Sequence, residues 1–416
     1  MSAPSRPTSP ARPLEGVRVI DMTTVMLGPY ATQMLADYGA DVIKVEAPGG
    51  DSTRATGPAL EPGMAATFIG ANRGKRSIVL DLKQAAARDA LGALAEQADV
   101  LIYSVRPQKM AALGLAPETL RTRYPRLIVV GVHGFAESGP YAGRPAYDDI
   151  IQGLCGLASL SRLQGAEPAY LPTVIADKTC ALFAVQAVLL ALAGRARTGE
   201  GCYVEVPMFE AMVSFTLVEH FYGAHFRPPL SAPGYVRLTT KWRKPYRTTD
   251  GYVCVVPYST EHWRRFFTEA GHPVLMDDAR FATMAERTRN IDLLYAELAA
   301  CLTERSTAEW LEACDRLDIP AAPLRDLGDL ECDPHLAATG FFATVEDAAM
   351  GRVVMPTAPL RFDGERPSPT MPPRLGEHTL EVLRQAGYDG AAIDALLSTG
   401  AALAPTRAGT PAGDRR

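Results

Sequence analysis

The sequence lacks the features that mark several large classes of protein. None of its seven cysteines belongs to a Cys-x-x-Cys pair; they stand at positions 155, 180, 202, 254, 301, 314 and 332. This dispersal predicts neither a disulfide framework nor a structural zinc site, and it suits a reducing cytoplasm. The seven histidines also stand singly, so no metal site is predicted. A net charge of −5 gives no global sign of binding to nucleic acid.

Four common functional motifs are missing as well. The chain has no Gly-x-x-x-x-Gly-Lys phosphate loop, no Gly-x-Gly-x-x-Gly turn, no Gly-x-Ser-x-Gly elbow and no His-Glu-x-x-His pair. Nucleotide hydrolysis, serine hydrolysis and zinc chemistry therefore lose most of their support.

Neither a membrane span nor a signal peptide is predicted. The most apolar helix-like run, 180–194, contains one strongly polar residue, Gln186. At about fifteen residues it is too short to span a bilayer, and it predicts a buried central helix that stops at Gly194. The start, Met1–Pro13, is rich in Ser, Pro and Arg without an apolar core, so we expect a disordered lead.

The composition that is present belongs to an ordinary globular protein. Its 416 residues, 47% hydrophobic and 21% charged, suggest two or three domain-sized units. Short β-branched runs alternate with helical runs, which predicts an α/β fold with a mostly parallel sheet covered on both faces. The expected strands are 17–21, 41–46, 77–82, 100–103, 127–132 and 202–206, and the expected helices are 28–38, 85–97, 117–124 and 208–220.

A proline-rich stretch with no steady period predicts a boundary between two domains. Beyond it, one strand and several helical stretches predict a smaller α+β unit, and the chain ends with two short helices. The expected segments are a lead at 1–13, a large domain at 14–222, a linker at 223–247, a small domain at 248–330, a return segment with helices that pack on the large domain at 331–400, and a flexible tail at 401–416.

Asp177 stands where the apolar central helix begins. Amide groups at a helix start have no partner, and the helix dipole favours an anion there. The commoner use of such an aspartate is as an N-cap. The alternative is a carboxylate nucleophile aimed at a cleft. The local sequence favours the cap and leaves the nucleophile open.

Several linked motifs carry a resemblance to a known family. They are Gly28-Pro29-Tyr30, Gln33–Glu46, Asn72–Ser77, Asp81–Lys83, Tyr124–Ile128, Gly134-Phe135, Gly139–Tyr141, Arg195–Gly201 and Leu375–Thr379. Together they resemble the family III CoA-transferases, the group that contains formyl-CoA and carnitine CoA-transferases and the α-methylacyl-CoA racemases. The resemblance runs from Leu14 to Leu397.

The resemblance implies a fold and a reaction. The implied fold has a Rossmann-like large domain and a smaller α+β domain, in a homodimer of interlocked chains. The implied reaction moves CoA from an acyl-CoA donor to a small carboxylic acid, with Asp177 as the nucleophile and the CoA thioester as substrate. No permanently bound cofactor, metal, nucleic acid or membrane is implied.

The family's CoA-binding segments can be carried over to this sequence. Lys83 and Arg106 are the expected electrostatic contacts for the nucleotide phosphates, because cations suit these groups. Arg73, Lys75 and Arg76 are further candidates, although a solvated basic turn explains them equally well. The implied CoA-binding residues are Met26, Leu27, Leu80, Asp81, Leu82, Lys83, Ser104, Val105, Arg106, Pro145, Ala146, Tyr147 and Asp148.

Two other functions stay open. Racemases of the family pair the aspartate with a histidine, where this chain has Tyr147. A tyrosine with an ordinary pKa of about 10 is a poor base near neutrality, and the setting of His133 favours packing or capping. A non-catalytic acyl-CoA-binding protein is the third reading, and the intact Asp177 argues against it.

A basic cluster marks the entry to the small domain. It contains Arg237, Lys241, Arg243, Lys244 and Arg247, without an acidic residue among them. A solvated linker is the simpler interpretation, since like charges are tolerated in water. The sharper hypothesis is that one or two of these cations contact an anionic acid or a CoA phosphate.

Overall fold

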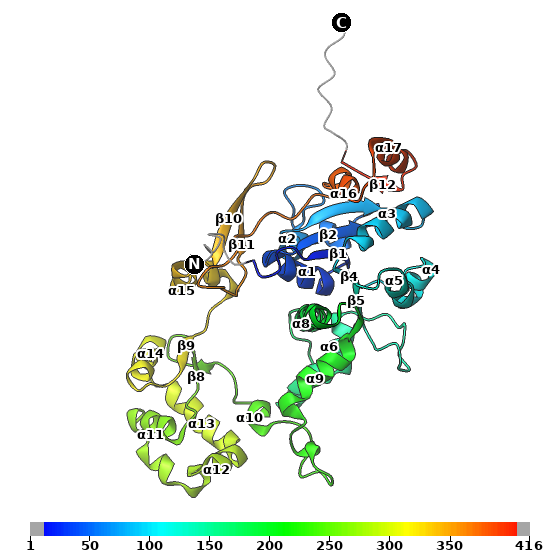
Figure 1. The fold of residues 1–416 in the computed structure, drawn as a ribbon. Coiled ribbons are helices and arrows are strands. Elements are labelled where there is room, and N and C mark those ends of the chain that lie inside the picture. The colour runs from blue at the N-terminus through cyan, green and yellow to red at the C-terminus, as the bar shows by residue number, and fades with distance from the viewer. Residues whose placement is uncertain (1–11, 406–416) are drawn as a thin grey trace, which may run out of the picture. The chain divides into compact units, whose positions relative to one another are not determined.

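The computed structural model describes residues 12–405, and the chain forms two compact units (Figure 1). Within the described residues, the large unit comprises 12–151, 173–212 and 334–405. The small unit comprises Gln152–Pro172 and Val213–Asp333. Residues 152–172, expected in the large domain, and 223–247, expected in a linker, therefore lie within the small unit. Most of the expected lead lies outside the described residues.

The large unit is built on one sheet of seven strands, in the order β12-β3-β2-β1-β4-β5-β6. Six strands run parallel, and only the edge strand β12 is antiparallel to its neighbour. The prediction of a mostly parallel α/β sheet is confirmed. The strands are β1 (Arg18–Met22), β2 (Asp41–Glu46), β3 (Arg76–Leu80), β4 (Val100–Tyr103), β5 (Ile128–His133), β6 (Tyr203–Pro207) and β12 (Ala402–Leu403).

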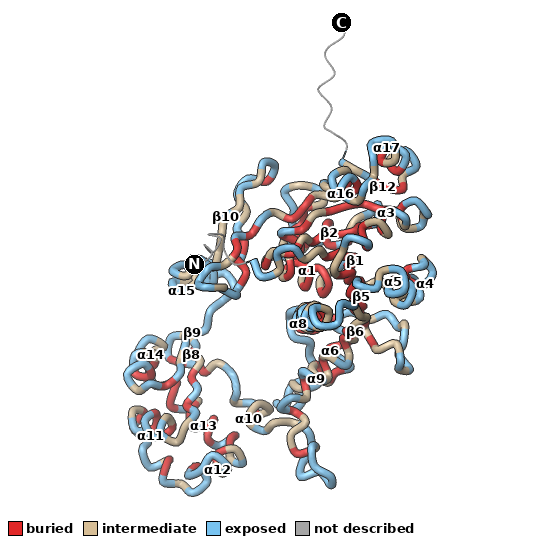
Figure 2. Tube along the Cα trace, viewed as in Figure 1, coloured by how far each residue is buried: buried red, intermediate tan, exposed pale blue. Residues whose placement is uncertain are grey.

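Helices cover both faces of this sheet, so its strands are largely buried (Figure 2). On one face, alternate strand residues such as Ile20, Ile43 and Leu101 pack in one core with Met110 of α4 (Pro107–Ala112) and with apolar residues of four other helices. These are α3 (Ala85–Glu96), α5 (Pro117–Arg123), α16 (Thr379–Gln385) and α17 (Gly390–Ser398). On the other, α1 (Leu27–Asp37) contacts β1 and β2, and α8 (Ile175–Thr198) contacts β5, β6 and α1.

The central helix α8 is longer than predicted. It has 24 residues and ends at Thr198, followed by Gly199 in the left-handed conformation with φ 78, whereas Gly194 lies inside it. Among the described helices, α8 is the only one long and apolar enough to cross a membrane. Less than half of its most apolar stretch is buried inside the protein. Its buried side consists mainly of small residues such as Ala184, and its other side exposes Leu182, Leu189 and Leu190.

The predicted flexible tail is wrong for its first residues. Ala401 and Ala402 are fully buried, and β12 pairs with β3 at the register Ala402↔Leu80. The amide of Asp81 also donates a hydrogen bond of 2.9 Å to the carbonyl of Ala401. A strand of two residues is too short to carry a pattern in the sequence.

Most of the remaining elements of the large unit are short. β10 and β11 form an antiparallel hairpin. Two helices, α6 and α9, begin in this unit and continue into the small one. The bounds are α2 (Ala66–Asn72), α4 (Pro107–Ala112), α6 (Asp148–Leu154), α9 (Met208–His220), α15 (Pro334–Ala338), β10 (Phe342–Asp347) and β11 (Gly351–Pro356).

The small unit combines a three-stranded antiparallel sheet with helices. Its core is rich in aromatic residues, and Phe266 stacks on Trp310 with the ring centroids 5.3 Å apart. Ser306 forms a capping box with Glu309, which fixes the start of α14. The elements are β7 (Tyr246–Arg247), β8 (Tyr252–Val255), β9 (Ala321–Pro323), α7 (Leu160–Leu163), α10 (Val236–Thr239), α11 (Thr260–Glu269), α12 (Met284–Arg289), α13 (Ile291–Leu302) and α14 (Thr307–Arg316).

Candidate active site

A pocket of about 420 Å³ lies in the large unit, at the carboxyl ends of the parallel strands. Its walls come from the segments that follow β1, β4, β5 and β6. The strand order reverses between β1 and β4, and open parallel sheets bind ligands outside the strand ends at such a point. The topology alone therefore marks this pocket as the candidate site.

Asp177 lines the pocket from the first turn of α8. The N-cap of this helix is Val174, which makes no capping hydrogen bond with its side chain, so the N-cap reading of Asp177 is wrong. The Asp177 amide donates a hydrogen bond of 3.0 Å to Oδ1 of Asp148. Within residues 12–405, no group donates a hydrogen bond to the Asp177 carboxylate. The side chain is therefore available to a ligand in the pocket.

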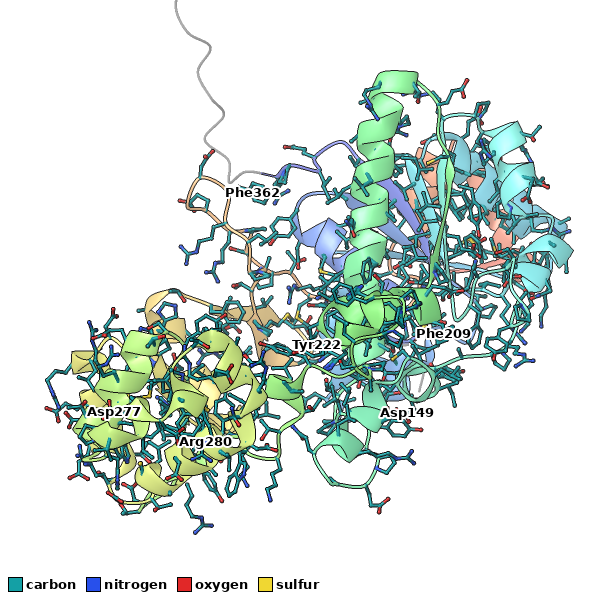
Figure 3. The ribbon with its side chains drawn as sticks, turned by 90° about the horizontal axis from the view of Figure 1, so that it is seen from below. Asp149, Phe209, Tyr222, Asp277, Arg280 and Phe362 are labelled. Atoms are coloured by element: carbon teal, nitrogen blue, oxygen red, sulfur yellow. The ribbon has the colours of Figure 1, made fainter. Side chains whose placement is uncertain are left out.

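The surroundings of Asp177 oppose its ionisation. Burial, and then the negative charges of Asp148 and Asp149, raise the pKa of Asp177 to about 7. Both neighbours stand at the start of α6, and Asp149 is labelled in Figure 3. A carboxylate of this kind is more basic and less hydrated than an exposed one. Near neutral pH it is partly ionised and suited to attack an electrophilic carbonyl.

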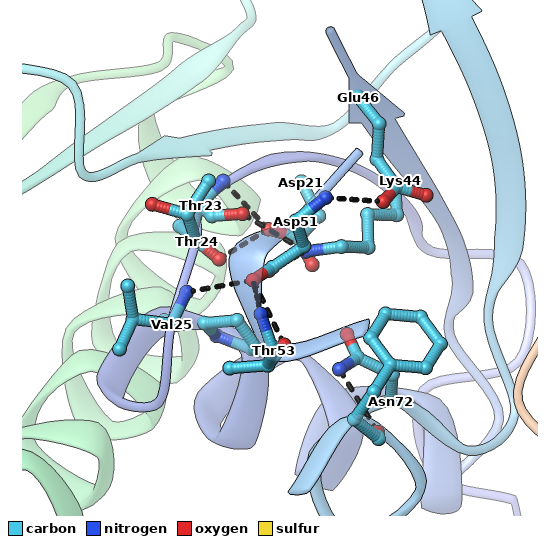
Figure 4. Close-up of polar contacts among 12 residues, drawn as sticks. Asp21, Thr23, Thr24, Val25, Lys44, Glu46, Asp51, Thr53 and Asn72 are labelled. Atoms are coloured by element: carbon cyan, nitrogen blue, oxygen red, sulfur yellow. Dashed lines mark hydrogen bonds and ion pairs between the residues drawn. The ribbon is translucent and has the colours of Figure 1, made fainter. Parts of the chain in front are cut away.

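The loop after β1 enters the pocket wall in a strained conformation. Val25 has φ 71, in the left-handed region that a β-branched residue rarely adopts. Its amide donates to Oδ1 of Asp51 over 3.3 Å (Figure 4). The amide of Thr24 donates to the hydroxyl of Ser104 over 3.1 Å. Two different segments therefore hold this loop in place.

Asp51 belongs to a buried ionic network beneath the loop (Figure 4). Lys44 Nζ lies 2.9 Å from Asp51 Oδ2, and Lys75 Nζ lies 3.0 Å from Asp21 Oδ2; all four side chains are fully buried. Burial alone would raise the pKa of Asp21, but the charges of Lys75 and Lys44 outweigh it and hold that pKa below its ordinary value. Burial lowers the pKa of Lys75 to about 8.

The basic turn fits neither of its two sequence interpretations, which were a solvated turn and a set of phosphate contacts. Lys75 belongs to the buried network. Arg73 is buried in an ion pair of 2.7 Å with Asp37, and Arg76 lies 2.6 Å from Asp41. These cations are neither a freely solvated turn nor open phosphate contacts, because structural carboxylates already hold them.

Comparisons with known proteins give the family. The model of "CoA-transferase family III" matches residues 14–379. The chain belongs to CoA-transferase family III. It is 33% identical to the "Succinate--glutarate CoA-transferase" of Agrobacterium fabrum over 388 residues, which cover 90% of this chain and 95% of the relative.

A second relative is similar in sequence and in structure. It is the "Probable fatty acyl-CoA transferase Rv3272" of Mycobacterium tuberculosis, 33% identical over 386 residues, which cover 89% of this chain and 98% of the relative. A crystal structure of Rv3272 matches with a TM-score of 0.77 at 30% identity, covering 89% of this chain and 99% of that one. The protein is therefore an enzyme of the group that transfers CoA between acyl-CoA and acids.

Most of the predicted site residues line the pocket, and the others lie outside its lining. Leu80 is buried in β3, Lys83 is exposed on the loop after it, and Asp148 accepts the Asp177 amide. Outside the pocket lining are Leu80, Asp81, Leu82, Lys83 and Asp148. The predicted residues that line it are Met26, Leu27, Ser104, Val105, Arg106, Pro145, Ala146, Tyr147 and Asp177. Their contacts with CoA stay a prediction.

Other residues that line the pocket were not among the predicted CoA-binding residues. Lys109 and Arg144 add positive charge, and the Arg144 guanidinium lies 4.5 Å from the centre of the Tyr141 ring. His133 was expected to pack or cap. It does pack, with its ring 5.4 Å from that of Tyr103, but it also lines the pocket, and burial lowers its pKa. Arg144 could have been found from its position next to Pro145, in a predicted CoA segment.

Proposed function

We propose that this protein moves CoA from an acyl-CoA thioester to a free carboxylic acid, with Asp177 as a covalent nucleophile. One observation carries the proposal. Asp177 faces the pocket at the strand switch point without a hydrogen-bond donor from the described residues, and burial raises its pKa to about 7. A purely structural carboxylate is normally compensated, as Asp21 and Asp51 are in the network below.

The first half of the reaction releases the donor acid. The Asp177 carboxylate attacks the thioester carbonyl, the carbon–sulfur bond breaks, and CoA leaves as a thiolate. The thiolate then attacks the aspartyl carbonyl of the mixed anhydride. The donor acid departs as a carboxylate, and an aspartyl-CoA thioester remains.

The second half repeats these steps in reverse order. The acceptor carboxylate attacks the aspartyl thioester, and CoA thiolate leaves again. The thiolate attacks the acceptor carbonyl of the new anhydride, which forms the product thioester and restores the Asp177 carboxylate. Each step exchanges one activated acyl group for another, so the electrons balance without an added oxidant or reductant.

The pocket offers contacts for the charged parts of the substrates. Arg106 and Lys109 are exposed on the β4 side, and Arg144 is exposed on the loop after β5. Within the described chain, none of these cations has a carboxylate at ion-pair distance. We assign Arg106 and Lys109 to the CoA phosphates, which leaves Arg144 for the carboxylate of the acid.

An Asp177→Asn variant tests the function directly. Asn keeps the size of the side chain, and the hydrogen bond from the residue 177 amide to Asp148 remains possible. Transfer from succinyl-CoA to glutarate, the pair suggested by the named relative, should fall by about a thousandfold or more. A panel of other donors and acids would follow by mass spectrometry. A folded variant with full transfer activity would refute the role of Asp177.

We further propose a homodimer of interlocked chains in the cytoplasm. The exposed stripe of Leu182, Leu189 and Leu190 on α8 supports a second copy as its cover, because such apolar faces mark interfaces. The seven cysteines form no disulfide, which supports a reducing compartment.

A racemase is the second candidate, because His133 lines the same pocket as Asp177. An aspartate–histidine pair could move the proton next to the thioester carbonyl. Such an enzyme would exchange that proton with deuterium from solvent without forming an adduct on Asp177. Transfer without deuterium exchange would exclude it.

A further inference from the structure

The loop after β1 forms one wall of the pocket. Thr24, Val25, Met26 and Leu27 line the same cavity as Asp177. Val25 has φ 71, and its β-branched side chain makes this left-handed conformation costly. A residue in such a conformation keeps it only where the surrounding structure holds it there. The shape of this wall therefore depends on the contacts that hold Val25.

Asp51 holds this loop from below, although it is not part of the pocket lining. Its Oδ1 accepts the amide of Val25 over 3.3 Å (Figure 4). The same oxygen accepts the amide and the hydroxyl of Thr53 over 3.0 and 2.8 Å. Its Oδ2 accepts Lys44 Nζ over 2.9 Å, and this ammonium also donates to the Thr23 carbonyl over 2.9 Å. Asp51 and Lys44 together therefore fix the loop at two points.

Asp51 is itself fixed in place. Its side chain is fully buried, and its amide donates to Glu46 Oε2 over 3.0 Å. Glu46 is paired in turn with Arg54 at 2.6 Å. Burial alone would raise the pKa of Asp51, but the charge of Lys44 and the hydrogen bonds outweigh it and hold that pKa below its ordinary value. Asp51 is therefore an ionised carboxylate that accepts hydrogen bonds on both oxygens.

We infer that Asp51 is a positioning residue of the acyl-CoA site, which acts through Val25 to set where the loop meets the substrate. This inference rests on the proposed function, which makes acyl-CoA the substrate of this pocket. A displacement of about 1 Å in a group that positions a substrate can lower a rate by about a hundredfold. Asp51 makes no contact with the substrate in this account, so its effect on the reaction is transmitted by the loop.

An Asp51→Asn variant of the full-length protein tests the inference. The partners of the two Asp51 oxygens, Val25, Thr53 and Lys44, all donate to them. Asparagine has one oxygen and one amino group, so it cannot accept from both the Val25 amide and Lys44. The value of kcat/KM for succinyl-CoA, with glutarate as the acid, should fall by about tenfold or more. Circular dichroism gives a temperature at which each variant is folded, and the rates are measured there.

Two comparisons separate positioning from stability. Asp37→Asn is the matched control, because it removes the charge of another buried ion pair, with Arg73 at the far end of α1, and should leave kcat/KM nearly unchanged. Val25→Gly supplies the second comparison, since glycine adopts a positive φ without strain and the loop then depends less on Asp51. Asp51→Asn should therefore lower kcat/KM by a smaller factor in the Val25→Gly background than in the wild type. A role in stability alone would give the same factor in both.

Amide hydrogen exchange in the wild-type protein adds a measurement that needs no variant. The Val25 amide should exchange slowly, because it donates to a buried carboxylate, and rapid exchange would overturn the inference even if Asp51→Asn did not fold. Unchanged kcat/KM in folded Asp51→Asn, or equal factors in the two backgrounds, would also overturn it. A wild-type protein that transfers no CoA with any donor and acid would refute the proposed function, whereas an active wild type with an unaffected Asp51→Asn refutes this inference alone.

Discussion

At the scale of single residues, the chemistry depends on how Asp177 is surrounded. Its helix places it in the pocket, and two neighbouring aspartates oppose its ionisation. The sequence identified this residue only through the family resemblance. Local reasoning favoured an N-cap, because the helix start could not be placed three residues earlier, at Val174. Its raised pKa depends on Asp148 and Asp149, whose position relative to the helix no local pattern reveals.

The first prediction concerns pH. Only the ionised carboxylate attacks the thioester, and the pKa of Asp177 is about 7. The value of kcat/KM for acyl-CoA should therefore rise with pH through about 7 and level off above it. A pH–rate profile measures this directly. A profile that is flat between pH 5 and pH 9, or that falls across that range, would contradict the assignment.

The second prediction changes that profile through a neighbour. Asp149→Asn removes a negative charge near Asp177 and leaves the bond between Asp148 and the Asp177 amide intact. The pKa of Asp177 should fall, so the rising limb should move to lower pH. Glu261→Gln, in the small unit, is the control and should leave the limb in place. A shift to higher pH in Asp149→Asn would count against the electrostatic account.

The third prediction concerns stability. The folded-state pKa of Asp177 lies above its usual unfolded value of about 3.9, so the folded protein binds this proton more tightly. Ionisation therefore costs stability as pH rises through about 7. Asp177→Asn should raise Tm at pH 8 and change it less at pH 5. Thermal unfolding at both pH values measures the difference, and a larger gain at pH 5 would reverse the expected sign.

At the scale of elements, the regular parts of the large unit followed from the sequence. β2, β4 and α9 have the predicted limits. The buried ionic network did not follow, since charged residues are normally read as exposed. Lys44 stands near the carboxyl end of β2, and Lys75 stands at the start of β3. Both are buried only by the assembled sheet and α1.

The fourth prediction tests this network. Lys75→Met removes one partner and leaves Asp21 charged and buried. The free energy of unfolding should fall by about 3–5 kcal/mol. Adding Asp21→Asn removes the uncompensated charge and should restore a large part of the loss. Urea denaturation of both single variants and the double variant gives the coupling. Strictly additive losses would show that the pair does not act as a unit.

At the scale of the whole molecule, the sequence predicted the parallel α/β sheet, and the resemblance brought together most of the pocket. The switch point itself depends on strand order, which pairs β1 with both β2 and β4. Such long-range pairing leaves no local signal. The prediction that residues 152–172 belong to the large domain was wrong for the same reason, because no local signal marks them as part of the small unit.

The fifth prediction concerns assembly. Interlocked chains cannot separate without substantial unfolding, so the protein should remain a dimer at nanomolar concentration. Pools with different tags should not exchange subunits under native conditions. Light scattering and affinity pull-down measure both properties. A monomer at low concentration, or exchange within minutes, would contradict interlocking.

The most direct test of the central claim is to trap the covalent intermediate. Protein incubated with acyl-CoA alone, without an acceptor acid, should accumulate an anhydride or thioester on Asp177. Hydroxylamine should then convert this carboxyl to a hydroxamate, which peptide mass spectrometry can locate. We predict modification at Asp177, dependent on acyl-CoA and absent from Asp177→Asn. Active protein that shows no such adduct, or that carries it on another carboxylate, would contradict the account.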